Sequence, residues 1–271
     1  MSMSDADIHQ EIVNSVGRYA RTVVYSSPAK CVCPTCGGPK SSRPDRCWAC
    51  QKTIADAEAQ GVPEEKLANR VRLGYYAIEY RDRMYKTVFG YKEKSPTSTE
   101  YRKTVELLLL DPLVLHFQCL TQVAGNVPVS AWATVPSTSS SRRYGEQHPL
   151  NAIVSSIFGQ KVPEILLNAE EKKKRRFSKS LFSVSEETIP DDMAQHVLLI
   201  EDSWVSGTTV QSAAAALKQA GAQQVSVFCV ARILDLEYCT EKLDKSTAQE
   251  FREREFDQDA CIWGLPPHPL V

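Results

Sequence analysis

The sequence predicts an α/β fold, with a mostly parallel sheet flanked by helices and a small cysteine-rich ribbon before it. Short β-type runs alternate with helical patterns after residue 130, and five of the nine cysteines fall between residues 31 and 50. Such strand–helix alternation is typical of βαβ units, whose strands are parallel. The predicted parts are an N-terminal helical extension (1–30), the ribbon (31–52), the α/β domain (70–234) and an acidic C-terminal extension (235–271).

The composition is that of an ordinary globular protein. Of 271 residues, 42% are hydrophobic and 24% are charged, and the net charge is −1, so the chain as a whole does not attract nucleic acid or membranes. No apolar run approaches the roughly 18 residues that a membrane span needs, and the first ten residues are too polar for a signal peptide. We therefore expect a cytoplasmic protein without a membrane span.

The ribbon is predicted from the spacing of four cysteines. Two C-x-x-C pairs, Cys33/Cys36 and Cys47/Cys50, are separated by ten residues. Each pair forms a tight knuckle whose thiolates point the same way, as a tetrahedral zinc site requires. Disulfides are the alternative, but an odd cluster of five cysteines without a secretory signal disfavours them. We predict a structural Zn²⁺ on these four residues, with Cys31 as a substitute for Cys33.

The remaining cysteines and the first half of the chain give weaker signals. Three cysteines are expected to pack as small hydrophobic side chains: Cys119, Cys229 and Cys239. Cys261 receives no role from the sequence. A short helix is expected within residues 5–25, a polar helical linker over 53–72, and a long helix over 99–123 that Pro112 breaks or kinks.

Residues 73–94 are both basic and aromatic. Such a stretch can hold a nucleic-acid strand by stacking its bases and pairing with its phosphates. The alternative, which we favour, is a helix whose tyrosines recur at helical spacing and pack on the core.

Four β-type runs define the predicted sheet: residues 131–135, 165–167, 196–200 and 224–230. Ligands of parallel sheets bind beyond the carboxyl ends of the strands. The run at 196–200 ends in Glu201 and Asp202, and a hydroxyl-rich loop and an alanine-rich helix from Thr208 to about Ala220 follow. The N–H groups and dipole of that helix suit a phosphate, and the adjacent acids suit a diol. Together they describe a ribose 5-phosphate.

A second loop, after the run at 131–135, carries hydroxyl groups and two arginines, Arg142 and Arg143. Guanidinium groups pair with phosphate oxygens in a bidentate fashion. Ser/Thr/Pro-rich stretches are usually plain loops, but this one is expected at the same edge of the sheet as the first. The two loops together would hold a doubly phosphorylated ribose.

Residues 197–209 resemble the phosphoribosyl pyrophosphate (PRPP) signature of type I phosphoribosyltransferases, in which a hydrophobic strand precedes an acidic pair and a Thr/Ser-Gly-x-Thr/Ser loop. Within that group the chain most resembles the ComF-like proteins. The matching features are the cysteine ribbon, the basic segment around 80–86, the Val-Pro-Ser loop before Arg142, the segment 216–222 and the closing Val-Ala-Arg232. The similarity covers residues 31–232 and implies a type I phosphoribosyltransferase-like fold for 70–234.

The resemblance implies roles for individual residues. Glu201 and Asp202 would be the active-site acids on the ribose 2′ and 3′ hydroxyls, and Mg²⁺ would bridge pyrophosphate and ribose oxygens. The PRPP-binding residues would be Ser203, Trp204, Val205, Ser206, Gly207, Thr208 and Thr209 around the 5-phosphate, and Ser137, Thr138, Arg142 and Arg143 facing the pyrophosphate. Trp204 stands where such loops carry small or aliphatic residues.

Two functions are compatible with these features. The first is transfer of the phosphoribosyl group of PRPP to a nitrogen nucleophile with release of pyrophosphate, for which the enzyme supplies positioning and charge neutralisation. The basic run 172–176 is a candidate for neutralising the leaving group, or else a solvated surface run. The second is a non-catalytic PRPP- or nucleotide-binding accessory protein of DNA uptake (competence) or DNA processing, with single-stranded DNA or a DNA-uptake or helicase protein as partner.

Overall fold

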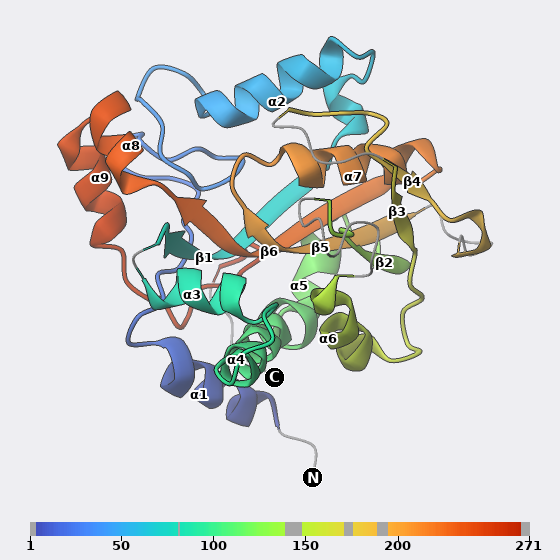
Figure 1. Ribbon diagram of the computed structural model, residues 1–271, viewed down its shortest axis with the longest axis horizontal. Coiled ribbons are helices and arrows are strands. Elements are labelled where there is room, and N and C mark those ends of the chain that lie inside the picture. The colour runs from blue at the N-terminus through green and yellow to red at the C-terminus, as the bar shows by residue number, and fades with distance from the viewer. Residues whose placement is uncertain (1–3, 81, 139–147, 171–175, 189–194, 267–271) are drawn as a thin grey trace.

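The computed structural model describes residues 4–80, 82–138, 148–170, 176–188 and 195–266. Its centre is a four-stranded parallel sheet in the order β1-β6-β5-β2 (Figure 1). The strands are β1 (Arg70–Ile78), β2 (Ala131–Thr134), β5 (His196–Trp204) and β6 (Gln224–Leu234). Helices flank both faces of the sheet, as Figure 1 shows. The predicted α/β fold with a mostly parallel, helix-flanked sheet is confirmed.

The sheet separates two layers of helices. One face is covered by α2 (Trp48–Glu58) and α7 (Thr208–Gln219). The helices on the other face are α1 (Asp5–Val16), α3 (Arg83–Gly90), α4 (Ser98–Leu110), α5 (Phe117–Val123) and α6 (Pro149–Phe158). The remaining elements are the short sheet of β3 (Leu167–Ala169) and β4 (Phe182–Val184), the turns Glu64–Lys66, Asp111–Leu115 and Glu186–Thr188, and the helices α8 (Leu236–Lys242) and α9 (Lys245–Arg252).

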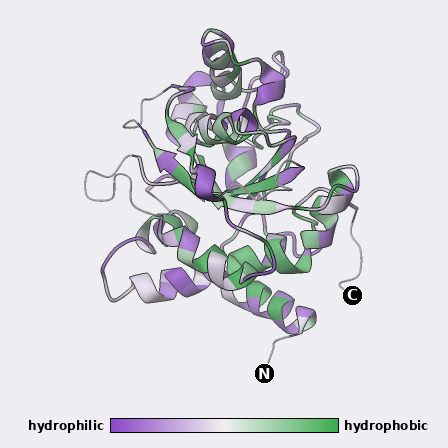
Figure 2. Cartoon of the chain, turned by 90° about the vertical axis from the view of Figure 1, so that its right-hand side faces the viewer, coloured by the Kyte–Doolittle hydropathy of each residue, from purple (hydrophilic) through white to green (hydrophobic). Residues whose placement is uncertain are grey.

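Each face of the sheet has its own hydrophobic core. Along β5, Val197 and Leu199 belong to the core under α7, whereas Leu198 and Ile200 belong to the core over α4 and α6. Successive strand residues point to opposite faces, so a strand buried on both sides needs an uninterrupted apolar run. Figure 2 shows hydrophobic residues gathered on the strands and where the helices meet the sheet.

The structure corrects the expected helix over residues 73–94. Its first part is the strand β1, and α3 begins only at Arg83. Tyr75 and Tyr76 are buried in the two different cores, one on each face of the sheet. Tyrosine is a good strand former, and adjacent tyrosines buried on opposite faces require a strand.

The run at 165–167 is also placed differently from its prediction. Its end lies in β3, which pairs antiparallel with β4 outside the central sheet. The preceding residues form only an isolated parallel bridge between Trp132 and Glu164 at the edge of β2. The chain therefore leaves this edge after one bridge and does not add a fifth parallel strand.

The predicted break at Pro112 is confirmed. Helix α4 ends at Leu110, the π turn Asp111–Leu115 follows, and α5 starts at Phe117. Across the described residues no single helix is both long and apolar enough to cross a membrane. Only the segments Ser98–Leu115 and Phe117–Val123, bent by 53°, pass that test when joined.

Candidate functional site

The loop between β5 and α7 is shaped by one glycine. Gly207 adopts φ +85, a left-handed conformation that favours glycine. A Cβ atom at this position would lie 2.1 Å from Cζ2 of Trp204, so a larger residue would displace the loop. Helix α7 starts at the next residue, and its first N–H groups have no partner within the helix. The turn therefore presents backbone donors and the positive end of the helix dipole to an anion.

Both predicted loops line one cavity of about 160 Å³ at the carboxyl edge of the sheet. They are more than 60 residues apart in sequence but adjacent in space, because β2 and β5 are neighbouring parallel strands. The predicted residues in its lining are Ser137 and Thr138 after β2, and Glu201, Ser203, Val205, Ser206, Gly207 and Thr209 at the end of β5 and after it. Hydroxyls from two strands and one carboxylate thus face the same space.

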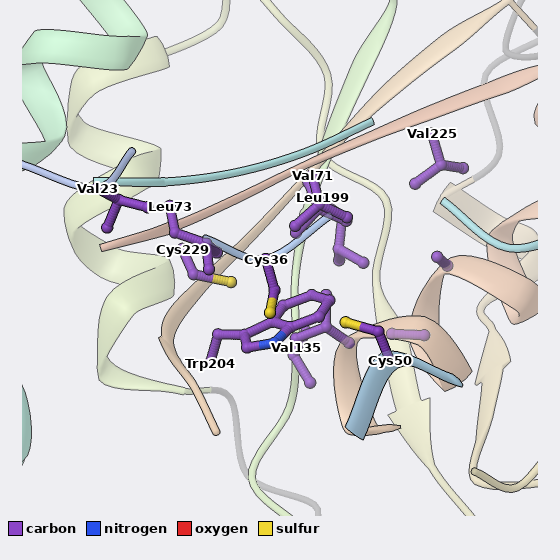
Figure 3. Packing of buried hydrophobic residues seen from close by; sticks show 14 of the residues in the cluster. Val23, Cys36, Cys50, Val71, Leu73, Val135, Leu199, Trp204, Val225 and Cys229 are labelled. Atoms are coloured by element: carbon purple, nitrogen blue, oxygen red, sulfur yellow. The ribbon is translucent and has the colours of Figure 1, made fainter. Parts of the chain in front are cut away.

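Other predicted residues lie elsewhere. Thr208 and Trp204 are buried and do not line the cavity. Figure 3 shows the indole of Trp204 beside the sulfurs of Cys36 and Cys50, in the core under α7. Arg142 and Arg143 lie outside the described residues. The large side chain in the signature loop therefore fills the core and leaves the phosphate-sized space open.

The two acids of the signature point in different directions. Glu201 is half-buried and lines the cavity, whereas Asp202 is fully buried. This divergence follows from the alternation of side chains along β5. Oδ2 of Asp202 lies 2.5 Å from Lys92 Nζ and 3.2 Å from His148 Nε2, and it accepts a hydrogen bond of 2.8 Å from the Tyr91 hydroxyl. Asp202 is thus the centre of an internal ionic cluster.

The neighbours of Asp202 keep its carboxyl group ionised. Burial alone would raise the pKa of Asp202, but the cation of Lys92 and the nearby His148 outweigh it and hold that pKa well below its usual range. Nδ1 of His148 accepts a hydrogen bond of 3.3 Å from the Leu150 N–H. We therefore assign the ring proton to Nε2, which donates it to Asp202. Asp202 is an anion paired with Lys92.

Lys92 and His148 also line the cavity, and the sequence did not single out either residue. Lys92 belongs to the basic and aromatic stretch, but nothing in that stretch distinguishes it from the neighbouring lysines and arginines. His148 is the N-cap of α6. Both approach Asp202 over separations of at least 54 residues, which local patterns do not reveal.

A candidate metal centre is formed by the four predicted cysteines. Their Sγ atoms all lie within 4.8 Å of one another, with 3.9 Å between Cys33 and Cys50 and 3.7 Å between Cys36 and Cys47. Tetrahedral zinc with bonds of about 2.3 Å separates its sulfurs by about 3.8 Å. Cys31 lies apart, with its Sγ 3.0 Å from Glu250 Oε2. The four cysteines could therefore bind a structural metal, as predicted.

The cysteine cluster also supports the phosphate-sized loop. The first pair turns at Gly37, and the second opens α2. Arg232, which is buried beside this cluster, donates hydrogen bonds of 3.1 and 3.0 Å to the carbonyls of Trp204 and Val205. Thr53 of α2 donates one of 3.4 Å to the carbonyl of Ser206. The metal centre and the loop after β5 are therefore parts of one packed unit.

Comparison with protein-family models and with curated proteins finds no match for this chain. Its function is therefore inferred from the geometry of the site and from the resemblance of its signature.

Proposed function

We propose that this protein binds PRPP with Mg²⁺ in the cavity between the loops after β2 and β5, and transfers its phosphoribosyl group to a nitrogen nucleophile with release of pyrophosphate. The observation that supports this most is the convergence of both predicted loops on one cavity that also contains Lys92 and Glu201. PRPP would need a phosphate site, a diol site and a second anion site within one ligand length, and the neighbouring positions of β2 and β5 in the sheet support this.

The 5-phosphate would lie against the start of α7. The hydroxyls of Ser206 and Thr209 line this part of the cavity, and the Ser206 hydroxyl is 3.1 Å from that of Thr208. The N–H groups of the first helical turn add donors that need no side chain. The glycine at 207 allows the phosphate to approach the backbone closely.

The ribose and Mg²⁺ would lie beside Glu201. Mg²⁺ prefers oxygen ligands and commonly takes one or two carboxylates together with substrate phosphates. Donor atoms of Glu201, Asp202 and His148 lie within 4.8 Å of one another. Of these three residues Glu201 fits the ion, because it is the carboxylate on the cavity wall, whereas Asp202 is paired with Lys92 and His148 offers a nitrogen. When bound, Mg²⁺ would offset the charge of the pyrophosphate.

The residues of the chain would act by positioning. Bond formation at C1 of the ribose accompanies departure of the pyrophosphate with its electron pair, and the proton of the nucleophile passes to solvent. Loops held on neighbouring strands keep both ends of the substrate in place, which lowers the entropic part of the barrier. Lys92 brings a cation to the cavity wall, where it stabilises negative charge as it develops on the leaving group.

The second candidate is a PRPP- or nucleotide-binding accessory protein without turnover. It is favoured by the pairing of Asp202 with Lys92, which commits one of the two signature acids to an internal contact. It is also favoured by an aromatic series that starts at Tyr80, whose side chain is 77% exposed. From there Tyr85 and Phe89 follow at ring distances of 5.2 and 4.4 Å and reach the cavity. Such a series can stack the bases of a single strand.

Replacing Glu201 with glutamine is expected to weaken PRPP binding by about 10- to 100-fold. The change keeps the size of the side chain and removes a charged acceptor, whose hydrogen bonds are worth about 1.5–3 kcal/mol. The measurement is titration calorimetry with PRPP and Mg²⁺. Glu241→Gln, an exposed position in α8, is the control and should bind like the wild type. Binding that is equally strong in Glu201→Gln would refute the proposed site.

Turnover separates the two candidates. Pyrophosphate release is measured with the wild type across a panel of nucleobases and amines at saturating PRPP. Release with any acceptor supports the transferase. If no acceptor gives pyrophosphate release, while the protein binds PRPP and raises the fluorescence anisotropy of labelled single-stranded DNA, the accessory protein is favoured.

A further inference from the structure

A second group of metal-ligand side chains lies in the other core, away from the cysteine knuckles. His116, Cys119 and Cys261 are all buried, and their donor atoms lie within 4.8 Å of one another. Cys119 and Cys261 belong to the core on the face of the sheet covered by α4 and α6, whereas the four ribbon cysteines belong to the core under α7. The two groups are therefore separate sites.

The fold brings two distant segments of the chain together at this site. The π turn Asp111–Leu115 ends with a hydrogen bond of 2.9 Å from the His116 N–H to the Asp111 carbonyl. Cys119 follows three residues later, which places it on the same face of the helix as His116. Single π turns within helices occur often at functional sites.

Cys261 is supplied by the C-terminal extension. Trp263 is fully buried, and its indole N–H donates a hydrogen bond of 3.2 Å to the Pro112 carbonyl. This contact fixes the segment that carries Cys261 against the π turn. The sequence assigned no role to this cysteine, because its partners are more than 140 residues away.

The distances agree with a metal between these groups. Cys119 Sγ lies 3.6 Å from His116 Nδ1. A tetrahedral zinc with bonds of about 2.3 Å to sulfur and about 2.05 Å to nitrogen separates two such ligands by about 3.6 Å. The other ring nitrogen, Nε2, is 3.4 Å from Asp111 Oδ1. A carboxylate on the remote nitrogen is the usual orienting contact of a metal-bound histidine.

We propose that His116, Cys119 and Cys261 bind a second metal ion, which fixes the C-terminal extension to the start of α5. Thiolate and imidazole ligands select zinc among the common biological cations. Binding would displace the two thiol protons to solvent. Three protein ligands leave a fourth position, which water can fill. Asp111 and Cys261 also line a cavity of about 250 Å³.

Metal content of the purified full-length protein tests this site. In reducing buffer without chelator, the wild type is expected to hold two zinc ions per chain and Cys261→Ser one. Cys239→Ser, at a buried cysteine of α8 outside both groups, is the matched control and should keep two. A single zinc in the wild type, or no difference between Cys261→Ser and Cys239→Ser, would overturn the proposal.

A measurement on the wild type alone guards against variants that do not fold. X-ray absorption at the zinc edge is expected to show an average of about three sulfur ligands per zinc, because a four-sulfur and a two-sulfur site contribute equally. An average of four sulfurs, or a Cys119–Cys261 disulfide found by mass spectrometry after alkylation, would refute the second site. Neither outcome depends on PRPP binding, so this proposal and the proposed function can fail independently.

Discussion

Replacing Cys36 with serine is expected to abolish metal binding at the four-cysteine site and to unfold the protein. The sulfur of Cys36 lies in the same core as Trp204 and the strands of the parallel sheet. Structural zinc contributes about 10–16 kcal/mol in small zinc-binding peptides, whereas whole domains are stable by only about 5–15 kcal/mol. Losing the metal would also leave the remaining thiols in an apolar core without their partner.

The change is measured as zinc content and as far-UV circular dichroism during urea unfolding. Cys31→Ser is the matched control, since Cys31 is a neighbouring buried cysteine whose sulfur contacts Glu250 and lies outside the cluster of four. It should keep its zinc and lose no more than about 1–2 kcal/mol, the value of a hydrogen bond. A Cys36→Ser protein that has lost one zinc per chain and still unfolds cooperatively at wild-type urea concentrations would contradict the assignment.

Replacing Asp202 with asparagine is expected to cost about 3–5 kcal/mol of unfolding free energy, because it removes the anion that lies 2.5 Å from the cation of Lys92 in a largely buried place. The side chains of Lys92 and Asp202 are 13% and 0% exposed. Lys52 and Asp56 on α2 form an exposed pair at 3.0 Å, so Asp56→Asn is the control and should cost less than about 1 kcal/mol. Urea unfolding at pH 7 measures both.

The pH dependence of the unfolding free energy is a second test of the pair between Asp202 and Lys92. The folded-state pKa of Asp202 is held below its usual range. The ionised carboxylate therefore stabilises the folded protein at pH values above the unfolded-state pKa of about 3.9, and this stabilisation is lost as the pH falls below that value. The difference between wild type and Asp202→Asn should therefore shrink on acidification from pH 4 downward. The double variant Asp202→Asn/Lys92→Met should recover part of the loss, since it also removes the cation that Asp202 neutralises. A difference below about 1 kcal/mol at pH 7 would refute a buried ion pair.

The parts of the fold that could be predicted are those with a local signal. The strand at 196–200 is an apolar run ended by acids, and the alanine-rich helix begins directly after Gly207, so both elements were placed within a few residues. The strand β1 was missed because Tyr75 and Tyr76 stand beside basic residues, and their spacing does not distinguish a strand from a helix. Only pairing with β6 reveals it.

The candidate site also contains residues that a local sequence signal predicts and residues that it does not. The hydroxyl loops and the C-x-x-C knuckles are each encoded within a few residues, and the sheet brings the loops together. The partners of Asp202 come from two other segments, and neither Lys92 nor His148 is marked by its neighbours in the sequence. Trp204 was assigned to the ligand, because the loop pattern does not show that the indole packs into the core beside the cysteines. Long-range packing decides these positions.

The central claim is that one cavity accommodates both phosphate-bearing ends of PRPP. Titration calorimetry of the wild type with Mg²⁺ and, in turn, PRPP, ribose 5-phosphate and pyrophosphate tests this most directly. Because both loops line the same cavity, PRPP should bind at least about tenfold more tightly than either of its halves, a difference of about 1.4 kcal/mol. PRPP that does not bind, or that binds no more tightly than ribose 5-phosphate, would contradict the account.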